Sequence, residues 1–173
     1  MITLDRATLT RVISHAASVA PSKAPNPELV NVLIHVDMGR LTVTATDMRQ
    51  ALVQAVANAV DPTASWTFAT PAGVLSSILR SMTGDVVSLA LSANGRRMTI
   101  EGGGAKFNVV GTDGEDYPPV VVSAGDSTIT IHGGDLGQMI DETLFAVSSD
   151  DGRGDLAGVH VETIERDGVS VLR

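Results

Sequence analysis

The sequence predicts an α+β fold made of repeated strand–helix–strand–strand units. Two observations lead to this fold class. Candidate helices begin near residues 5, 71 and 135, about 65 residues apart. Each helix is flanked by segments with the alternating polarity typical of strands. Because 43% of the 173 residues are hydrophobic, the chain can bury a core of this kind.

The first repeat opens with a strand at Ile2–Leu4 and a helix from about 6 to 20, for which Asp5 is a suitable N-cap. A proline-rich segment, 21–27, ends the helix and is expected to be extended. The inward stripe of the helix consists of Leu9, Val12, Ile13, Ala16 and Ala20. The expected strands that follow are 29–37, 41–45 and 51–57, with a tight turn at 38–40.

The second repeat begins with a strand at 65–69. Thr70 and Pro71 are expected to be the N-cap and the first residue of a helix that reaches about Met82. Its inward stripe consists of Val74, Leu75, Ile78, Leu79 and Met82. The expected strands that follow are 85–92, 97–101 and 106–111, with a hairpin turn at 93–95.

The third repeat is incomplete. It comprises a strand at 127–132, a helix at about 134–148, and strands at 157–164 and 168–172 around a turn at 165–168. The helix stripe consists of Leu136, Met139, Ile140, Thr143 and Val147. The loop at 113–119 is the best boundary, so we expect one domain over residues 1–122 and an incomplete one over 123–173.

Charge is unevenly distributed. The chain carries −8 in total, with +1 in residues 1–60 and −7 in residues 123–173. The outward faces of the first two helices combine small residues with one arginine each: Arg11, Ser14 and Ser18, then Gly73, Ser77 and Arg80. Such a face suits the passage of a polyanion, although an ordinary solvated helix is the alternative. Asp141 and Glu142 on the third helix argue against phosphate contact there.

Composition excludes several functional classes. The chain has no cysteine, which excludes a disulfide scaffold, a thiolate metal site and a cysteine nucleophile, and favours a reducing, cytoplasmic compartment. No signal peptide or membrane-spanning run is present. The acidic loop 150–155 lacks the spacing of an EF-hand, and Gly102–Gly104 lacks the lysine of a phosphate-binding loop. We therefore expect no catalytic site and no cofactor.

Several segments combine in an order that spans the whole chain. They are Ile2–Arg6, Lys23 with 29–34, 41–47, 70–72, 78–80, 111–118, 145–149, Arg153 and 156–159. Together they resemble the bacterial replicative sliding clamps, the beta subunits of DNA polymerase III holoenzyme. None of these segments is a strict signature alone, and the resemblance lies in their joint order and spacing.

The resemblance implies the DNA clamp fold, with helices on the inner face and antiparallel sheets outside. It further implies a head-to-tail homodimeric ring around duplex DNA that tethers DNA polymerase for processive synthesis and has no catalytic site of its own. Partners of this family include polymerase and clamp-loader subunits, which bind through short peptide motifs. The Thr-Asp-Gly-His-Arg-type motif expected after Arg173 is missing, so the chain is expected to be a fragment that does not close a ring.

The resemblance also assigns roles to individual residues. Non-specific DNA contacts are assigned to Lys23, Arg80, Arg11 and Arg153. A subunit interface is assigned to Phe107 and Val109 on an edge strand, with Arg97 and Lys106 beside it. Leu156 is assigned to the partner-peptide pocket. The alternatives are a solvated loop lysine, a half-buried strand and a plain core leucine. For the whole chain, the alternative is a small acidic protein-interaction module unrelated to DNA, with a metal-assisted hydrolase a distant third.

Overall fold

The computed structural model describes residues 1–173 except 57–60, 62, 121–128, 151–155 and 168. Contacts divide the chain into two compact units, Met1–Val122 (unit 1) and Ser123–Arg173 (unit 2). The two units are described separately below.

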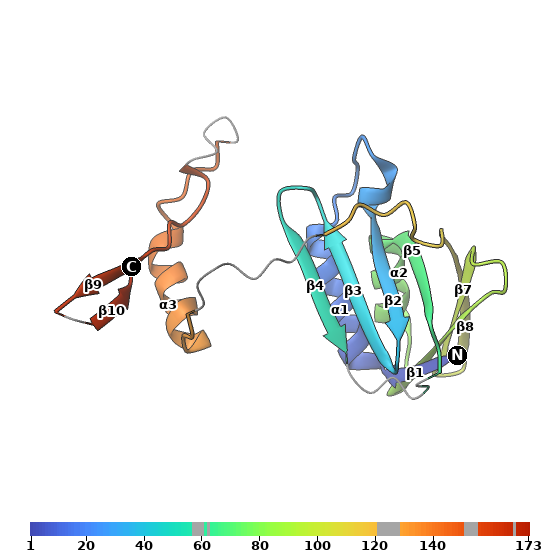
Figure 1. Cartoon of the computed structure of the whole chain (residues 1–173). Helices are drawn as coiled ribbons and strands as arrows, with labels where there is room; N and C mark the ends of the chain where they lie inside the picture. Colours follow the sequence, from blue (N-terminus) through green and yellow to red (C-terminus); the bar gives the residue numbers. More distant parts are fainter. Residues whose placement is uncertain (57–60, 62, 121–128, 151–155, 168) are drawn as a thin grey trace. The chain divides into compact units, whose positions relative to one another are not determined.

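Unit 1 contains two successive repeats of a strand, a helix and three further strands (Figure 1). Repeat one consists of β1 (Ile2–Asp5), α1 (Arg6–Val19), β2 (Asn31–Asp37), β3 (Arg40–Thr46) and β4 (Ala51–Val56). Repeat two consists of β5 (Trp66–Pro71), α2 (Ala72–Ser81), β6 (Val86–Leu91), β7 (Arg97–Gly102) and β8 (Ala105–Val110). The predicted α+β class and the repeated order of elements are thus confirmed.

The two repeats exchange their first strands. The antiparallel sheets have the orders β1-β6-β7-β8 and β4-β3-β2-β5, so each sheet combines three strands of one repeat with the opening strand of the other. Ile2 lies opposite Leu89 in one sheet, and Ile34 lies opposite Phe68 in the other. Neither repeat can therefore complete its sheet without the other.

The core of unit 1 lies between the helices and the sheets. The helix α1 packs against β3 and β4 and α2 against β5, and the two helices lie side by side behind the β4-β3-β2-β5 sheet in Figure 1. The buried helix positions are Leu9, Val12, Ile13 and Ala16 on α1, with Ala72, Leu75, Ser76 and Leu79 on α2. Alternate positions of the strands face these stripes, for example Val32, Ile34 and Val36 on β2.

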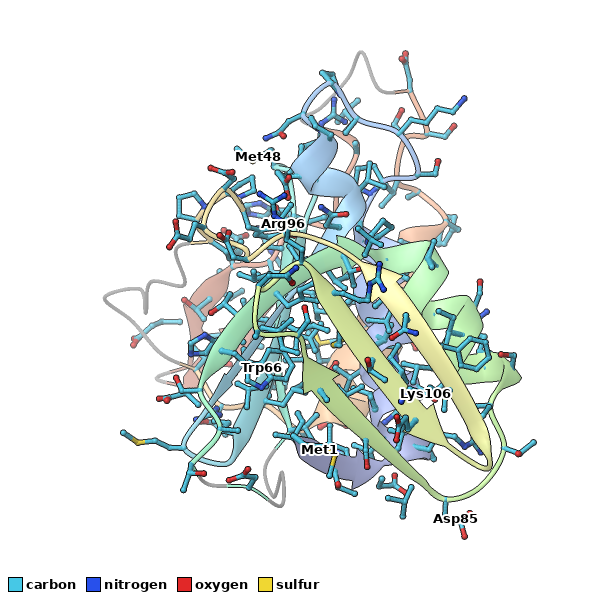
Figure 2. The ribbon with its side chains drawn as sticks, turned by 90° about the vertical axis from the view of Figure 1, so that its right-hand side faces the viewer. Met1, Met48, Trp66, Asp85, Arg96 and Lys106 are labelled. Carbon is cyan, nitrogen blue, oxygen red and sulfur yellow. The ribbon has the colours of Figure 1, made fainter. Side chains whose placement is uncertain are left out.

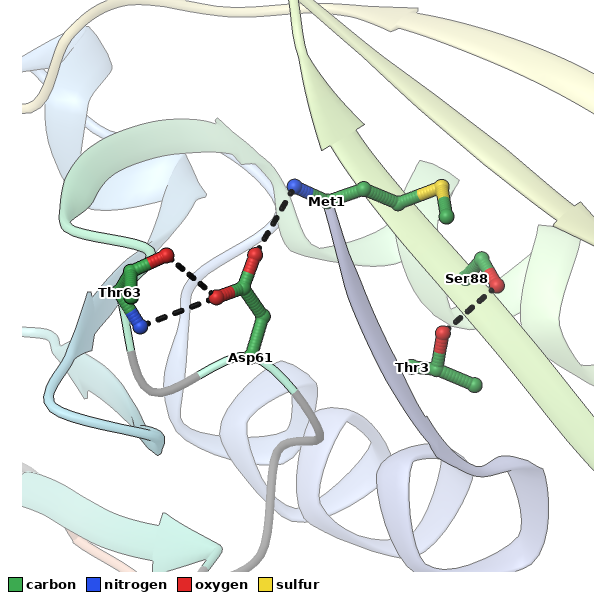
Figure 3. A network of polar contacts seen from close by, with 5 residues as sticks. All are labelled: Met1, Thr3, Asp61, Thr63 and Ser88. Carbon is green, nitrogen blue, oxygen red and sulfur yellow. Dashed lines mark hydrogen bonds and ion pairs between the residues drawn. The ribbon is translucent and has the colours of Figure 1, made fainter.

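Polar contacts hold the opening strand β1 in place (Figure 3). The Thr3 and Ser88 hydroxyl oxygens lie 3.1 Å apart across the β1–β6 pair. The Met1 amino group lies 4.0 Å from Asp61 Oδ2, and Thr63 donates to Asp61 Oδ1 through its backbone N–H at 3.0 Å and its hydroxyl at 2.6 Å. The hydrogen bonds from Thr63 lower the pKa of Asp61, so its carboxylate keeps its charge beside the chain terminus.

The last described segment of unit 1 is anchored by Tyr117. Its ring is buried and its hydroxyl donates to the Asn31 carbonyl at 3.3 Å. Burial raises the pKa of Tyr117 above its usual value. Gly114, three residues earlier, has φ +85°, and a Cβ there would lie 2.5 Å from Leu33 Cδ1. The segment after β8 therefore packs closely onto the β4-β3-β2-β5 sheet.

The start of α2 differs from the expectation. Thr70 is not the N-cap: it belongs to β5, is fully buried, and donates through Oγ1 to the Val110 carbonyl at 3.1 Å. Pro71 takes the N-cap position instead. Val74 was expected to face inward but is exposed, because it lies on the far side of the stripe formed by positions 72, 75, 76 and 79.

The proline-rich segment also differs from the expectation. Pro27–Val30 (η1) is a 3₁₀ turn rather than extended chain, and β2 begins at Asn31 rather than at Leu29. The turn is capped by Asn26, whose Oδ1 accepts from the Glu28 backbone N–H at 3.0 Å. The tight turn after β2 is confirmed, with Met38 at φ +46° and Gly39 at φ +74°.

Unit 2 contains the helix α3 (Gly133–Leu144) and the antiparallel hairpin of β9 (Thr163–Arg166) and β10 (Val169–Leu172). The helix ends four residues earlier than expected. Of the strand expected at 157–164 only residues 163 and 164 are in β9, which continues through 165 and 166, where a turn was expected. Residues 129–132 form no strand, while 127 and 128 of that expected strand lie outside the described residues. None of the residues of α3 is buried. A strand needs a neighbouring strand to complete its backbone hydrogen bonds, and the described part of unit 2 contains only the two strands of this hairpin.

The N-cap of α1 gives a pH-dependent prediction. Asp5 Oδ1 accepts from the Thr8 backbone N–H at 2.7 Å, and hydrogen bonding from Thr8 lowers the pKa of Asp5. The stabilisation is then present above the ordinary carboxyl pKa of 3.8 and is lost as pH falls through the lower folded-state value. We expect Asp5→Ala to lower the thermal midpoint at pH 7 and to reduce its acid sensitivity. Asp5→Asn, which keeps a capping oxygen without titrating, should retain the midpoint; a midpoint equal to that of Asp5→Ala would contradict the capping role.

Glycine substitutions give a second prediction. Gly73 lies inside α2, and a Cβ there would meet no atom within 4 Å. Gly73→Ala should therefore raise the free energy of unfolding by roughly 0.5–1 kcal/mol, because alanine loses less backbone entropy in a helix. Gly111→Ala is the matched comparison: its Cβ would lie 2.0 Å from the Ala69 carbonyl oxygen, so it should destabilise. Urea unfolding of the two variants measures both changes in the free energy of unfolding, which should rise for Gly73→Ala and fall for Gly111→Ala. Equal changes in the two variants would contradict this prediction.

Candidate nucleic-acid interface

The exposed face of α1 and α2 is sparsely but uniformly basic. Arg11 and Arg80 are exposed on it, and neither helix contains an aspartate or a glutamate. The outward side chains between them include the small Ser14, Ser18 and Ser77 and the glycine Gly73. The larger His15 on α1 and Val74 on α2 are exposed as well. The outward orientation expected from the sequence is therefore found, with Ser14 half-buried between the helices.

Arg80 is positioned by the neighbouring helix. Its Nη2 donates to Ser14 Oγ at 3.2 Å, which ties α2 to α1 across the exposed face. Arg11 makes no hydrogen bond or ion pair with any residue that the structure describes. Neither cation is neutralised by a carboxylate within the described part of unit 1, so both retain charge for an external anion.

The remaining expected DNA contacts lie elsewhere. Lys23 is exposed in the segment between α1 and η1, where Pro21 and Pro25 stiffen the chain, and has no polar partner among the described residues. Arg6 does not belong to the face, because its Nε donates to the Gly84 carbonyl at 2.5 Å and fixes the start of α1 to the loop before β6. Arg153 lies outside the described residues.

The strand expected at a subunit interface is an edge strand. Within the described sheet, β8 pairs only with β7 and leaves its other side open. The side chains of Phe107 and Val109 point inward, with Val109 buried and Phe107 packed against the core. A strand that pairs with this edge would therefore meet the backbone groups of β8 and its outward-facing side chains, and not the side chains of Phe107 and Val109.

The basic residues beside β8 lie at opposite ends of its sheet. Lys106 Nζ lies 2.6 Å from Glu101 Oε1, in an exposed ion pair across β7 and β8. Arg97 begins β7 at the other end, and its side chain is exposed. Its neighbour Arg96 and the distant Lys106 are labelled in Figure 2. An interface role for these residues stays a prediction.

Unit 2 presents a different chemistry. Gln138 Nε2 donates to Glu142 Oε1 at 2.7 Å on the outward face of α3, and Asp141 is exposed beside them. Leu156 is 56% exposed within unit 2, and both its assignment to a partner-peptide pocket and its interpretation as a core residue stay predictions. Its backbone carbonyl accepts from the Ser148 N–H at 2.8 Å.

The described residues contain no cluster of metal-ligating side chains and no membrane-spanning helix. Among them, no three His, Asp or Glu side chains come together to hold a metal ion, and 151–155 of the acidic loop lie outside that part of the chain. His35 Nδ1 lies 3.1 Å from Thr67 Oγ1 on the sheet surface. No described helix is both long and apolar enough to cross a bilayer.

One positioning contact could not be found from the sequence. Ser14 and Arg80 belong to different repeats, and nothing in the chain between them signals that they meet. Ser14 and Arg80 occupy equivalent outward positions in the two repeats. This equivalence predicts that both lie on the exposed helix face, but it does not predict the hydrogen bond between them.

Comparison with known proteins identifies the family. The family described as "DNA polymerase III beta subunit, N-terminal domain" matches residues 1–123, and the chain belongs to it. The beta sliding clamp of Caulobacter vibrioides (strain NA1000 / CB15N) is 30% identical over 173 residues, covering 99% of this chain and 46% of that protein.

Solved structures extend the likeness to the fold. The DNA polymerase sliding clamp from Caulobacter crescentus superposes with a TM-score of 0.85 at 29% identity, over 99% of this chain and 46% of that one. The sliding clamp from Pseudomonas aeruginosa bound to griselimycin gives 0.79 at 26% identity, over 87% of this chain and 40% of that one. The chain therefore spans less than half the length of these relatives.

Proposed function

We propose that this chain acts as the N-terminal part of a replicative sliding clamp, which encircles duplex DNA and tethers DNA polymerase for processive synthesis. The observation that supports this role is the exposed face of α1 and α2, with Arg11 and Arg80, small side chains and no carboxylate. Membership of the clamp family favours this function over an acidic interaction module unrelated to DNA.

The contacts with DNA would be non-specific. Lys23, Arg11 and Arg80, with Arg153 from unit 2, would meet phosphates singly, because they belong to separate segments of the chain, and phosphate contacts carry no base specificity. A chain with a net charge of −8 repels DNA elsewhere. A few separate cations among small side chains can then hold a duplex loosely and let it slide.

The domain arrangement follows the same proposal. Unit 1 would be the complete N-terminal domain, and 123–173 an incomplete central domain. The open edge of β8 would pair with another subunit in a head-to-tail homodimer of the full-length protein, through backbone hydrogen bonds flanked by Arg97 and Lys106.

Partner peptides would use unit 2. Leu156 is exposed and could contribute to a pocket for short motifs of polymerase and clamp-loader subunits. The Pseudomonas aeruginosa relative was solved bound to griselimycin, which supports a ligand-binding role for clamps of this family. The protein itself would be a cytoplasmic processivity subunit without catalysis or a cofactor.

The DNA-facing role predicts a salt-dependent, sequence-independent affinity. Fluorescence anisotropy of a labelled duplex, titrated with the 173-residue chain at increasing salt, should report weak binding. Replacing Lys23, Arg11 and Arg80 by alanine should reduce the affinity and lower the salt slope by up to about 3, since each phosphate contact contributes about 0.9.

A charge-matched control separates the helix face from net charge. Replacing Arg40, Arg49 and Arg96 by alanine makes the chain equally more acidic but alters hairpins and a loop. This control should leave most of the salt slope unchanged. An equal loss in both triple variants, or tight binding to one sequence, would contradict the proposed role.

A further inference from the structure

His15 differs from the other three histidines of the chain in its surroundings. Its imidazole makes no hydrogen bond or ion pair with any residue that the structure describes. Each of the other three has a polar partner. The pairs are His35 Nδ1 with Thr67 Oγ1 at 3.1 Å, His132 Nδ1 with Asp135 Oδ1 at 3.9 Å, and His160 Nε2 with Glu162 Oε2 at 3.7 Å. The imidazole of His15 is therefore available to an external group.

His15 belongs to the exposed face of α1 and α2. It follows Arg11 by four residues and precedes Ser18 by three, and all three residues are exposed. Residues at these spacings are neighbours on one side of a helix. The face therefore carries a titratable imidazole one helical turn from one of its two arginines.

The strands that pack against α1 direct no charged group toward His15. These strands are β1, β2, β3 and β4, and the helix α2 packs against α1 beside them. The charged and titratable residues of all these elements and of α1 are Asp5, Arg6, Arg11, His35, Asp37, Arg40 and Arg80. Because His35, Asp37 and Arg40 alternate with the buried positions of their strands, they face away from the helices.

The helix layer contributes one carboxylate, which lies far from His15 along the chain. Asp5 caps the beginning of α1, ten residues before His15, and its Oδ1 accepts from the Thr8 backbone N–H at 2.7 Å. The other charged groups of this layer are cations, among them Arg11 on α1 and Arg80 on α2. A protonated His15 would therefore have cations as its charged neighbours in the described part of unit 1.

Protonation of His15 is coupled to the presence of an anion. Like charges four residues apart on a helix repel, so a cationic imidazole gains nothing from Arg11 in the free chain. A DNA phosphate beside these two side chains attracts both and favours the protonated imidazole. Because coupling between two ligands is reciprocal, the proton in turn strengthens the binding of the phosphate.

We propose that His15 is a proton-linked contact with duplex DNA. Protonation of its imidazole adds a cation to the exposed face of α1 and α2, so the chain binds DNA more tightly as the pH falls. An ordinary imidazole titrates near pH 6.5, which places the change between about pH 8 and pH 6. The inference rests on the proposed function, because it uses the same helix face, and it adds a dependence on pH to that function.

Salt titrations at two pH values test the proposal. Fluorescence anisotropy of a labelled duplex with the 173-residue chain should give an affinity roughly two- to fivefold higher at about pH 6 than at about pH 8. The slope of log affinity against log salt should steepen by up to about 0.9 over the same interval, because one phosphate contact is added. His15→Gln should remove both changes.

Two matched variants separate His15 from general protonation of the chain. His35→Gln removes an exposed imidazole from the outer face of a sheet and should retain both changes. His15→Lys, whose ammonium is charged at both pH values, should show the steeper salt slope at both. Trp66, the single tryptophan, lies on β5 and reports by fluorescence that unit 1 is folded at each pH in every variant.

The outcomes distinguish this inference from the function on which it rests. Duplex binding with the same affinity and salt slope at both pH values would overturn the role of His15 and leave Arg11 and Arg80 as the proposed DNA contacts. An equal loss of the pH effect in His15→Gln and His35→Gln would overturn it as well. Absence of duplex binding at either pH would overturn both the proposed function and the inference.

Discussion

The exchange of opening strands between the two repeats is the constraint on which unit 1 depends. Because β1 completes the sheet of repeat two and β5 completes that of repeat one, each sheet contains backbone hydrogen bonds contributed by both repeats. The helices that follow these strands are thereby brought together, with Leu9 and Leu75 turned toward the common core. The crossed pairing thus orders the two helices as one layer rather than as separate elements.

This arrangement leaves one face of the helix pair without a packing role. The apolar stripes point to the sheets, so the opposite face is free to be set by its environment, and Gly73 shows this clearly because nothing lies near the position of its missing Cβ. A glycine inside a helix weakens it, and no packing contact in unit 1 requires it here. Small residues and two cations on an otherwise acidic chain are what the proposed contact with DNA would require of this face.

The sequence was informative wherever the determinants are local. The stripe of α1, the Asp5 cap and the turn at Met38 follow from spacing and backbone preference, and all three are confirmed. Two errors, the Pro27–Val30 turn and the inward assignment of Val74, concerned local features, whereas the error at Thr70 arose from a contact between distant segments. Thr70 was assigned to a cap because its local context suits one, but its hydroxyl bonds to the Val110 carbonyl, forty positions away. For the same reason the helix face could be predicted but the Ser14–Arg80 contact could not.

In unit 2, a local sequence pattern that predicts buried positions and a strand is not matched by the structure. Ile129 and Ile140 occupy the same repeat positions as Ile2 and Ile13, yet remain partly exposed, and the strand expected before α3 is absent from residues 129–132. Helix α3 nevertheless forms, since its hydrogen bonds are internal, whereas a strand requires a neighbour. The apolar residues of one repeat are therefore buried in this fold only when a second repeat packs against it. In unit 2 a single repeat forms its helix, but residues 129–132 form no strand.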